Sequence, residues 1–307
     1  IQIMKEKQSF IEKILDNKAI IFIFTGIAVR IFMLIFYYYT HMLDPQRSWG
    51  DVGINFQPEI YYPPISTYLL ILFRIFSFES IEIFAFWAFL WELLTSLMFY
   101  FVLKNFQIPN KKYAFGLFLI NPFLFLNNVF SLDNCGYHIT DSFFFFFFFM
   151  ALIFYFRKEL YSKYLFYIFI GLSICAKYYT LPALGFFFIK FIYQKNWKEM
   201  KIFAICMSST LIIFLITPIF FLQGYLESLI YWTDLRGIFP LYISLLPIGT
   251  IFLLYTLLRL RKGDSFEILI ISILAMSSFI FLSDPYLRLF QSVIFYGILK
   301  SKYFFTF

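Results

Sequence analysis

The chain has 307 residues, of which 62% are hydrophobic, 25% aromatic and only 14% charged, and its mean hydropathy is +0.79. Soluble domains are about half apolar and a quarter charged, so this composition excludes a soluble globular domain, a disordered chain and a disulfide scaffold. The net charge of +7 lies mostly in short Lys and Arg clusters between apolar runs, which indicates membrane topology and not nucleic-acid binding. The sequence predicts an integral membrane protein.

The apolar runs are numerous enough for roughly ten crossings of about 20 residues each. The first run, 19–39, follows a polar stretch, 1–18, that we interpret as a cytoplasmic tail, and we expect a retained helix there and no cleaved signal peptide. Further transmembrane or re-entrant helices are expected at 64–78, 81–103, 113–130, 141–156, 164–176, 180–193, 202–222, 240–258, 266–282 and 289–299. The predicted fold is an all-α polytopic membrane protein of roughly 10–11 helices in one domain, 1–307, with a helical first outer loop.

Two abundant or reactive residue types are interpreted as structural. The seven phenylalanines at 143–149 suggest lipid-facing filler. The cysteines, Cys135, Cys175 and Cys206, have spacings that match no zinc or redox motif, so we interpret all three as packing residues.

The charge distribution predicts which loops share a face of the membrane. Basic clusters at Lys104/Lys111/Lys112, Arg157/Lys158/Lys163, Lys195/Lys198/Lys201, Arg259/Arg261/Lys262 and Lys300/Lys302 are expected in the cytoplasm with the N-terminal tail. The outer face then holds 41–63, 131–141, 177–180, 223–239 and 283–288. Two full crossings between 63 and 104 would contradict this pattern. Either the segment 64–78 is short and does not fully span, or the basic cluster at 104–112 breaks the rule, and we favour the first alternative.

The first outer loop, 41–63, carries the candidate general bases, Asp44 and Asp51. A carboxylate in a partly desolvated cleft can take the proton of an acceptor hydroxyl as the new bond forms. The alternative is that each acid caps a short helix, and Pro45 after Asp44 favours that reading there. Tyr62 precedes Pro63 and Pro64, a pattern that indicates a rigid helix start and equally permits contact with substrate.

The second outer loop and the remaining outer charges supply further candidates. Asp133, His138 and Asp141 lie where one span ends and the next begins, and Lys177, followed by Tyr178, breaks the positive-inside pattern. Lys177 therefore needs an anionic partner, either a carboxylate such as Asp133 or Asp141 or a bound phosphate. Two arginines, Arg236 and Arg288, each lie near an Asp, so local ion pairing competes with substrate binding.

Cofactor motifs are sparse. His41 and His138 are the two histidines, which excludes a His-rich metal site, while a carboxylate site for a divalent ion stays open without a spacing signature. The sequence contains no Walker motif and no GxGxxG, so nucleotide binding has no support. We expect no certain cofactor.

Several segments, in order, resemble the GT-C superfamily of polyprenyl-phosphate-sugar glycosyltransferases. QRSW at 46–49, YPPxxxY at 62–68 and DNCGYHITDS at 133–142 are similar to segments of the endoplasmic-reticulum glucosyltransferases that extend the N-glycan precursor. The KYYTLP segment at 177–182 is similar to one in the mannosyltransferase that adds the first GPI mannose. The sequence departs from both patterns: Asp141 stands where the glucosyltransferases have Asn, and the mannosyltransferase DxD is not reproduced.

The resemblance implies an inverting transfer of glucose or mannose from a dolichyl- or polyprenyl-phosphate sugar to a lipid-linked glycan acceptor, on the outer or lumenal face. It implies an Asp base, Asp51 slightly ahead of Asp44, and substrate binding by Tyr62, Asp133, His138, Asp141, Lys177, Tyr178, Arg236 and Arg288. The expected location is the endoplasmic-reticulum membrane in a eukaryote or the cytoplasmic membrane in a prokaryote. Two alternatives stay open: a lipid or sugar transporter or flippase, which predicts internal repeats, and a noncatalytic subunit of a membrane complex.

Overall fold

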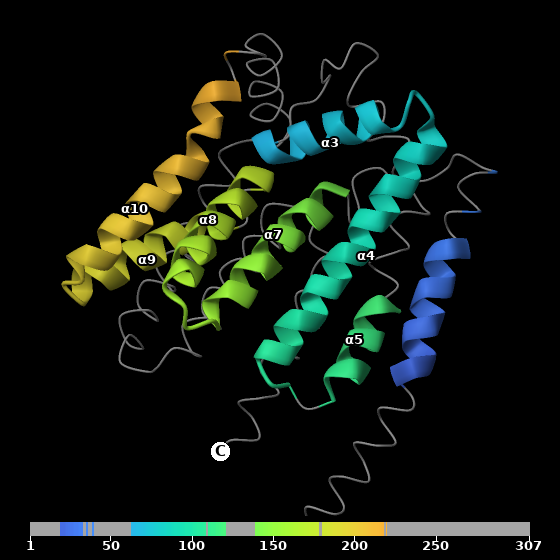
Figure 1. Cartoon of the computed structure of the whole chain (residues 1–307), viewed down its shortest axis with the longest axis horizontal. Helices are drawn as coiled ribbons and strands as arrows, with labels where there is room; N and C mark the ends of the chain where they lie inside the picture. The colour runs from blue at the N-terminus through green and yellow to red at the C-terminus, as the bar shows by residue number, and fades with distance from the viewer. Residues whose placement is uncertain are drawn as a thin grey trace, which may run out of the picture.

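The structure, a computed structural model, describes residues 19–32, 35, 39, 63–108, 110–120, 139–177, 180–217 and 219. All regular secondary structure in these residues is helical, as the composition predicts. The helices are the first helix (Ala19–Phe32), α3 (Pro64–Phe76), α4 (Ile81–Asn105), α5 (Lys111–Leu119), α7 (Ile139–Tyr155), α8 (Leu160–Ala176), α9 (Leu181–Tyr193) and α10 (Trp197–Leu211) (Figure 1). The helices expected beyond residue 219 lie outside the described residues.

Hydrogen bonds identify a shared end of the helices. Asn105, the last residue of α4, donates to the carbonyl oxygen of Ile153 near the end of α7 (3.4 Å), and Lys163 near the start of α8 pairs with Glu199 of α10 (2.7 Å). The predicted basic clusters of the described residues gather here, at what we call the basic end. They comprise Lys104, Lys111, Lys112, Arg157, Lys158, Lys163, Lys195, Lys198 and Lys201.

Helix α3 lies across the opposite end of the bundle, which we call the α3 end (Figure 1). Pro63 precedes the helix with extended backbone (φ −49°, ψ 146°) and Pro64 is its first residue, as the sequence predicts. Thirteen residues make a helix of about 20 Å, which is shorter than the roughly 30 Å hydrocarbon layer of a bilayer. The prediction of a short helix here is confirmed. Of the two helices between residues 63 and 105, α4 runs from the α3 end to the basic end and α3 does not.

The phenylalanine run at 143–149 lies largely inside the bundle, which corrects its interpretation as lipid-facing filler. Phe144, Phe148 and Phe149 have no exposed surface, because α7 packs between α4 and α8. Phe143, also fully buried, meets the rings of Phe73 and Trp91 edge-on at centroid distances of 5.5 and 5.3 Å. A helix that is apolar all round can be surrounded by other helices or by lipid, and most of the phenylalanines of this run contact neighbouring helices.

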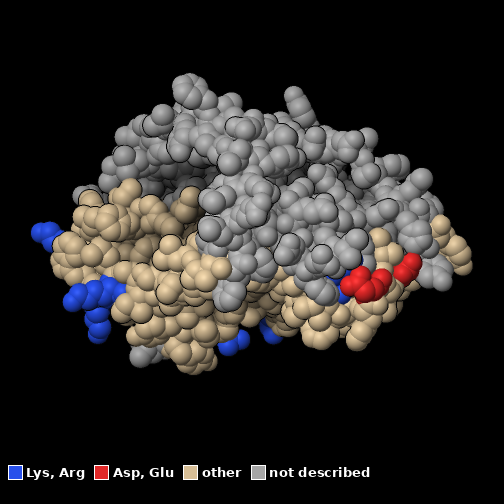
Figure 2. All heavy atoms as spheres, turned by 90° about the horizontal axis from the view of Figure 1, so that it is seen from above, with Lys and Arg blue, Asp and Glu red and all other residues tan. Residues whose placement is uncertain are grey.

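Among the described residues, two helical segments are long and apolar enough to cross a membrane, Ile81–Asn105 and Trp197–Thr217. The other described apolar helices are shorter. Figure 2 shows that the described surface in that view is largely uncharged, with Lys and Arg at its margin. Large apolar side chains are exposed on the described helices, including Ile205 (69%) and Leu215 (74%). The two cysteines described, Cys175 and Cys206, are buried and free, as expected of packing residues.

Candidate functional site

The structure describes two of the predicted site residues, Asp141 and Lys177, and brings them together. Lys177 Nζ donates to Asp141 Oδ1 in an ion pair whose side chains are 12% and 0% exposed. This contact satisfies the prediction that Lys177 needs an anionic partner, and Asp141 is one of the two carboxylates that the sequence offered for it. The other predicted site residues lie outside the described residues: Asp44, Asp51, Tyr62, Asp133, His138, Tyr178, Arg236 and Arg288.

Local backbone geometry explains how the pair forms. Asp141 lies in the first turn of α7 as the structure describes that helix, where the free backbone N–H groups favour a negative charge. Lys177 follows the last residue of α8 and has extended backbone (φ −154°, ψ 146°), while its N–H still bonds the carbonyl oxygen of Ser173 (2.9 Å). Because α7 and α8 are antiparallel neighbours, the start of one and the end of the other meet at the α3 end.

Helix α3 covers this pair of helix ends through side-chain hydroxyls. Ser66 Oγ donates to the carbonyl oxygen of Ala176 (2.7 Å), the residue directly before Lys177. Tyr68 Oη donates to Thr217 Oγ1 (3.2 Å), which attaches α3 to the end of the α10 segment as well. Ser66 of the YPPISTY segment is therefore bonded to the residue directly before the KYYTLP segment.

Buried hydroxyl groups continue around the ion pair. Ser173 Oγ and Thr180 Oγ1 lie 2.6 Å apart, and Thr95 Oγ1 lies 3.0 Å from Ser142 Oγ, next to Asp141. Thr140 Oγ1 is buried and has no hydrogen-bond partner within the described part of the chain. Polar groups are costly to bury in an apolar bundle, so their concentration at one end marks the polar part of the described core.

No protein-family model, curated protein or solved structure matches this chain. The site is therefore defined by its own geometry. Three segments quoted for the resemblance, 62–68, 133–142 and 177–182, have their described parts at the same end of the bundle, opposite the basic end. The Lys177 ammonium, whose side chain is 12% exposed, can attract an anionic group there by a charge-assisted hydrogen bond, whereas Asp141 and the serine and threonine hydroxyls around it are buried.

The described residues contain no candidate metal site. No group of three or more His, Cys, Asp or Glu side chains lies close enough there to hold an ion. Both predicted bases and both histidines lie outside the described residues. A divalent-ion site formed by carboxylates of the outer loops, which the sequence permits, therefore stays a prediction.

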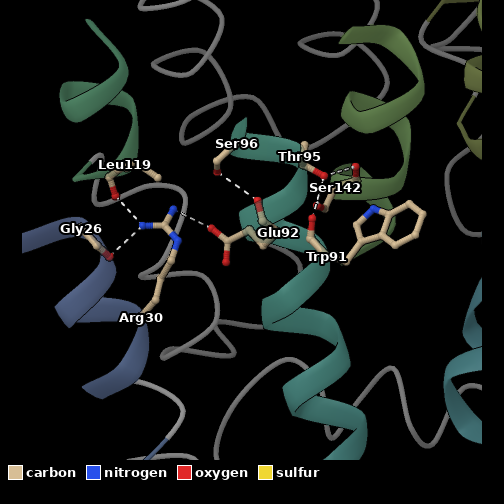
Figure 3. Close-up of polar contacts among 8 residues, drawn as sticks. All are labelled: Gly26, Arg30, Trp91, Glu92, Thr95, Ser96, Leu119 and Ser142. Atoms are coloured by element: carbon tan, nitrogen blue, oxygen red, sulfur yellow. Dashed lines mark hydrogen bonds and ion pairs between the residues drawn. The ribbon is translucent and has the colours of Figure 1, made fainter. Parts of the chain in front are cut away.

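Sequence reasoning missed a second buried polar group, formed by Arg30 of the first helix and Glu92 of α4 (Figure 3). Arg30 Nη2 donates to Glu92 Oε1 (2.8 Å), and the side chains are 2% and 6% exposed. The signal was present, because each is an ionisable residue inside a predicted membrane span, and such residues are rare and commonly functional.

Proposed function

We propose that the chain is a polytopic membrane glycosyltransferase that transfers a hexose, glucose or mannose, from a polyprenyl-phosphate sugar to a lipid-linked glycan acceptor. Transfer takes place on the outer or lumenal face, in the endoplasmic-reticulum membrane of a eukaryote or the cytoplasmic membrane of a prokaryote. One observation carries the proposal: segments far apart in sequence, each resembling the same superfamily, meet at the α3 end through the Lys177–Asp141 and Ser66–Ala176 contacts.

The arrangement of charge supports a membrane orientation for this site. The basic end of the described helices has the positive-inside character of a cytoplasmic face, and the α3 end lies opposite. The exposed side chains of α3, including Leu72 (42%), Ile75 (50%) and Phe76 (50%), are apolar. A short helix with an apolar outer face suits a position along the membrane interface, where a lipid-linked substrate presents its headgroup.

The proposed chemistry divides between the two predicted outer loops and the polar cluster at the α3 end. Asp51, or else Asp44, removes the proton of the acceptor hydroxyl as its oxygen attacks the anomeric carbon of the donor sugar. The bond between that carbon and the phosphate oxygen breaks on the opposite side, so the configuration inverts and the polyprenyl phosphate leaves with the electron pair. Lys177 compensates the negative charge of the departing phosphate.

The buried partner of Lys177 fits this role. Asp141 holds the ammonium at one place, so the lysine is positioned before the donor arrives. Because Lys177 is 12% exposed whereas Asp141 is fully buried, a phosphate can approach the pair from the side of the lysine. The pair thus presents positive charge outward and keeps its negative charge inside the bundle.

The test is transfer from labelled dolichyl-phosphate glucose and dolichyl-phosphate mannose to lipid-linked glycans, using the purified chain in liposomes. We expect one of the two sugars to be transferred, and we expect the double variant Asp44→Ala, Asp51→Ala to lose transfer while retaining its fold. Lys198→Gln, at an exposed residue of the basic end, is the matched control and should keep full activity. Absence of transfer from both donors by the unmodified chain refutes the proposed function, and full activity of the double Asp variant refutes the base assignment.

A further inference from the structure

The Arg30–Glu92 pair connects more than two helices. Besides the carboxylate, Arg30 Nη1 donates to the carbonyl oxygens of Leu119 (2.6 Å) and of Gly26 in its own helix (3.0 Å). Leu119 is the last residue of α5, and carbonyls in the last turn of a helix have no intrahelical donor. The guanidinium therefore joins the first helix, α4 and α5 at one point (Figure 3).

Close helix packing makes this junction possible. A Cβ atom added to Gly26 would lie 2.6 Å from Leu119 Cβ, and one added to Gly116 would lie 2.8 Å from Phe22 Cβ. The first helix and α5 thus approach at a distance that only glycine permits on each side. Because residues 22 and 26 face 116 and 119, the two helices run parallel, from the basic end toward the α3 end.

Two of the three helices that Arg30 joins, the first helix and α5, precede the predicted outer loops in sequence. The loop 41–63, with Asp44 and Asp51, comes after the first helix, and the loop 131–141 begins 12 residues after Leu119, the last residue of α5. On α4, Glu92 points toward Arg30 while Thr95, one turn further on, bonds Ser142 beside Asp141 (Figure 3). Helix α4 therefore carries two separate polar contacts three residues apart, one to Arg30 of the first helix and one to Ser142 of α7, beside the described part of the site.

We propose that Arg30 and Glu92 are a positioning pair, which fixes the first helix and the end of α5 against α4 and thereby sets the position of these two helices, from which the chain continues toward the predicted outer loops, relative to Lys177. As a role in sugar transfer, this rests on the proposed function. The pair acts through helix placement and not on the reacting atoms.

The decisive variant replaces both members, Arg30→Leu with Glu92→Leu. Removing one partner of a buried ion pair leaves an uncompensated charge, whereas replacing both with apolar residues is often neutral for stability. The double variant therefore separates folding from positioning. Helix position is measured, independently of activity, as the distance between spin labels at Tyr39→Cys and Phe78→Cys, both exposed (77% and 80%), with the native cysteines replaced.

We expect the double variant to keep its thermal midpoint but to widen the Tyr39–Phe78 distance distribution at least about twofold. A control label pair at Tyr161 and Trp197, on α8 and α10, should keep its distribution, since the hydrogen bonds of Arg30 go to the first helix, α4 and α5. In the transfer assay kcat should fall about tenfold while KM for the donor stays within about twofold, because a misplaced base slows the reaction without weakening phosphate binding.

An unchanged Tyr39–Phe78 distribution in the double variant overturns the proposal, and so does an unchanged kcat in an active enzyme. If the double variant does not fold, Arg30→Lys provides the same test, since lysine keeps the charge but lacks the planar fork that reaches separate acceptors. We then expect a smaller widening of the Tyr39–Phe78 distance distribution. An unchanged distribution in Arg30→Lys would overturn the proposal. If the unmodified chain transfers no sugar, the proposed function fails, while the distance measurement still decides whether the pair positions the first helix.

Discussion

Lys177 and Asp141, 36 positions apart in the chain, form a buried ion pair where α8 ends and α7 begins. Asp141 has no exposed surface, so its charge depends on the protein for compensation. An ion pair in such surroundings is retained at a cost in desolvation, and apolar residues could fill the same space more cheaply. The contribution of this pair to stability is therefore open to direct measurement.

Asp141→Asn should strongly destabilise the protein. The change removes the negative charge that compensates Lys177 while preserving the volume of the side chain, and breaking a buried pair in this way costs roughly 3 kcal/mol or more. Unfolding measured by steric trapping in bicelles gives the difference directly. Lys198→Gln, which alters an exposed charge at the basic end, should change stability by less than about 0.5 kcal/mol.

The double variant Asp141→Asn, Lys177→Met completes the cycle. Its loss of stability should be smaller than that of Asp141→Asn alone, because no uncompensated ammonium remains. If the double variant lost as much stability as the sum of the losses in Asp141→Asn and Lys177→Met, the two side chains would not be energetically coupled, contrary to the geometry.

The helices were predictable from sequence, whereas most of their packing was not. Apolar length and the Pro63–Pro64 pair indicated where the described helices lie, although α5 ends at Leu119 where a helix to residue 130 was expected. The alternation of basic clusters favoured a short helix at 64–78, and α3 is short. The phenylalanine run shows the limit of this reasoning, because uniform hydrophobicity has no periodicity and cannot distinguish lipid from a neighbouring helix. Only the placement of α7 between α4 and α8 decides that its rings are buried.

The candidate site was predictable only in part for a similar reason. Lys177 was recognisable as a charge in need of a partner, but the choice between Asp133 and Asp141 depends on which residue the start of α7 brings to the end of α8. Arg30 and Glu92 lie 62 positions apart, and neither has a local motif. Their pairing follows from glycine-mediated contact of the first helix with α5, a tertiary feature that single residues do not encode.

Replacing a buried phenylalanine of α7 should cost much more than replacing a half-buried one. Phe148→Ala removes a fully buried ring and leaves a cavity among packed helices, which we expect to lower the free energy of unfolding by about 3 kcal/mol. Phe147→Ala, at a neighbouring position that is partly exposed, serves as the matched control and should cost about half as much or less. Equal losses at both positions would show that the run faces a uniform environment, as lipid would provide.

The short α3 predicts that the chain does not cross the membrane between residues 62 and 78. Single cysteines at Ser48 and at Phe78, introduced into a background without native cysteines, should react with a membrane-impermeant maleimide from the same side of sealed vesicles. A cysteine at Lys158, in the turn between α7 and α8, should react only from the opposite side. Labelling of Ser48→Cys and Phe78→Cys from opposite sides would mean that α3 crosses the membrane.

Replacing Gly171 of α8 with alanine should cost more stability than replacing Gly185 of α9. A Cβ atom added to Gly171 would lie 2.0 Å from Thr210 Oγ1 and 2.8 Å from Thr210 Cβ, so Gly171→Ala forces α8 and α10 apart. We expect a loss of about 2 kcal/mol from this overpacking. Gly185→Ala in α9 is the matched control, since nothing lies within 4 Å of its added Cβ.

The control change should stabilise α9 by about 0.5–1 kcal/mol, because alanine loses less backbone entropy than glycine on entering a helix. Truncating the obstacle provides a second check: Gly171→Ala combined with Thr210→Ala removes the clashing Oγ1 and should recover part of the loss. Thermal unfolding of the three variants and the unmodified chain in detergent measures the series. If Gly171→Ala proved as harmless as Gly185→Ala, the close contact of α8 with α10 at Thr210 would be wrong.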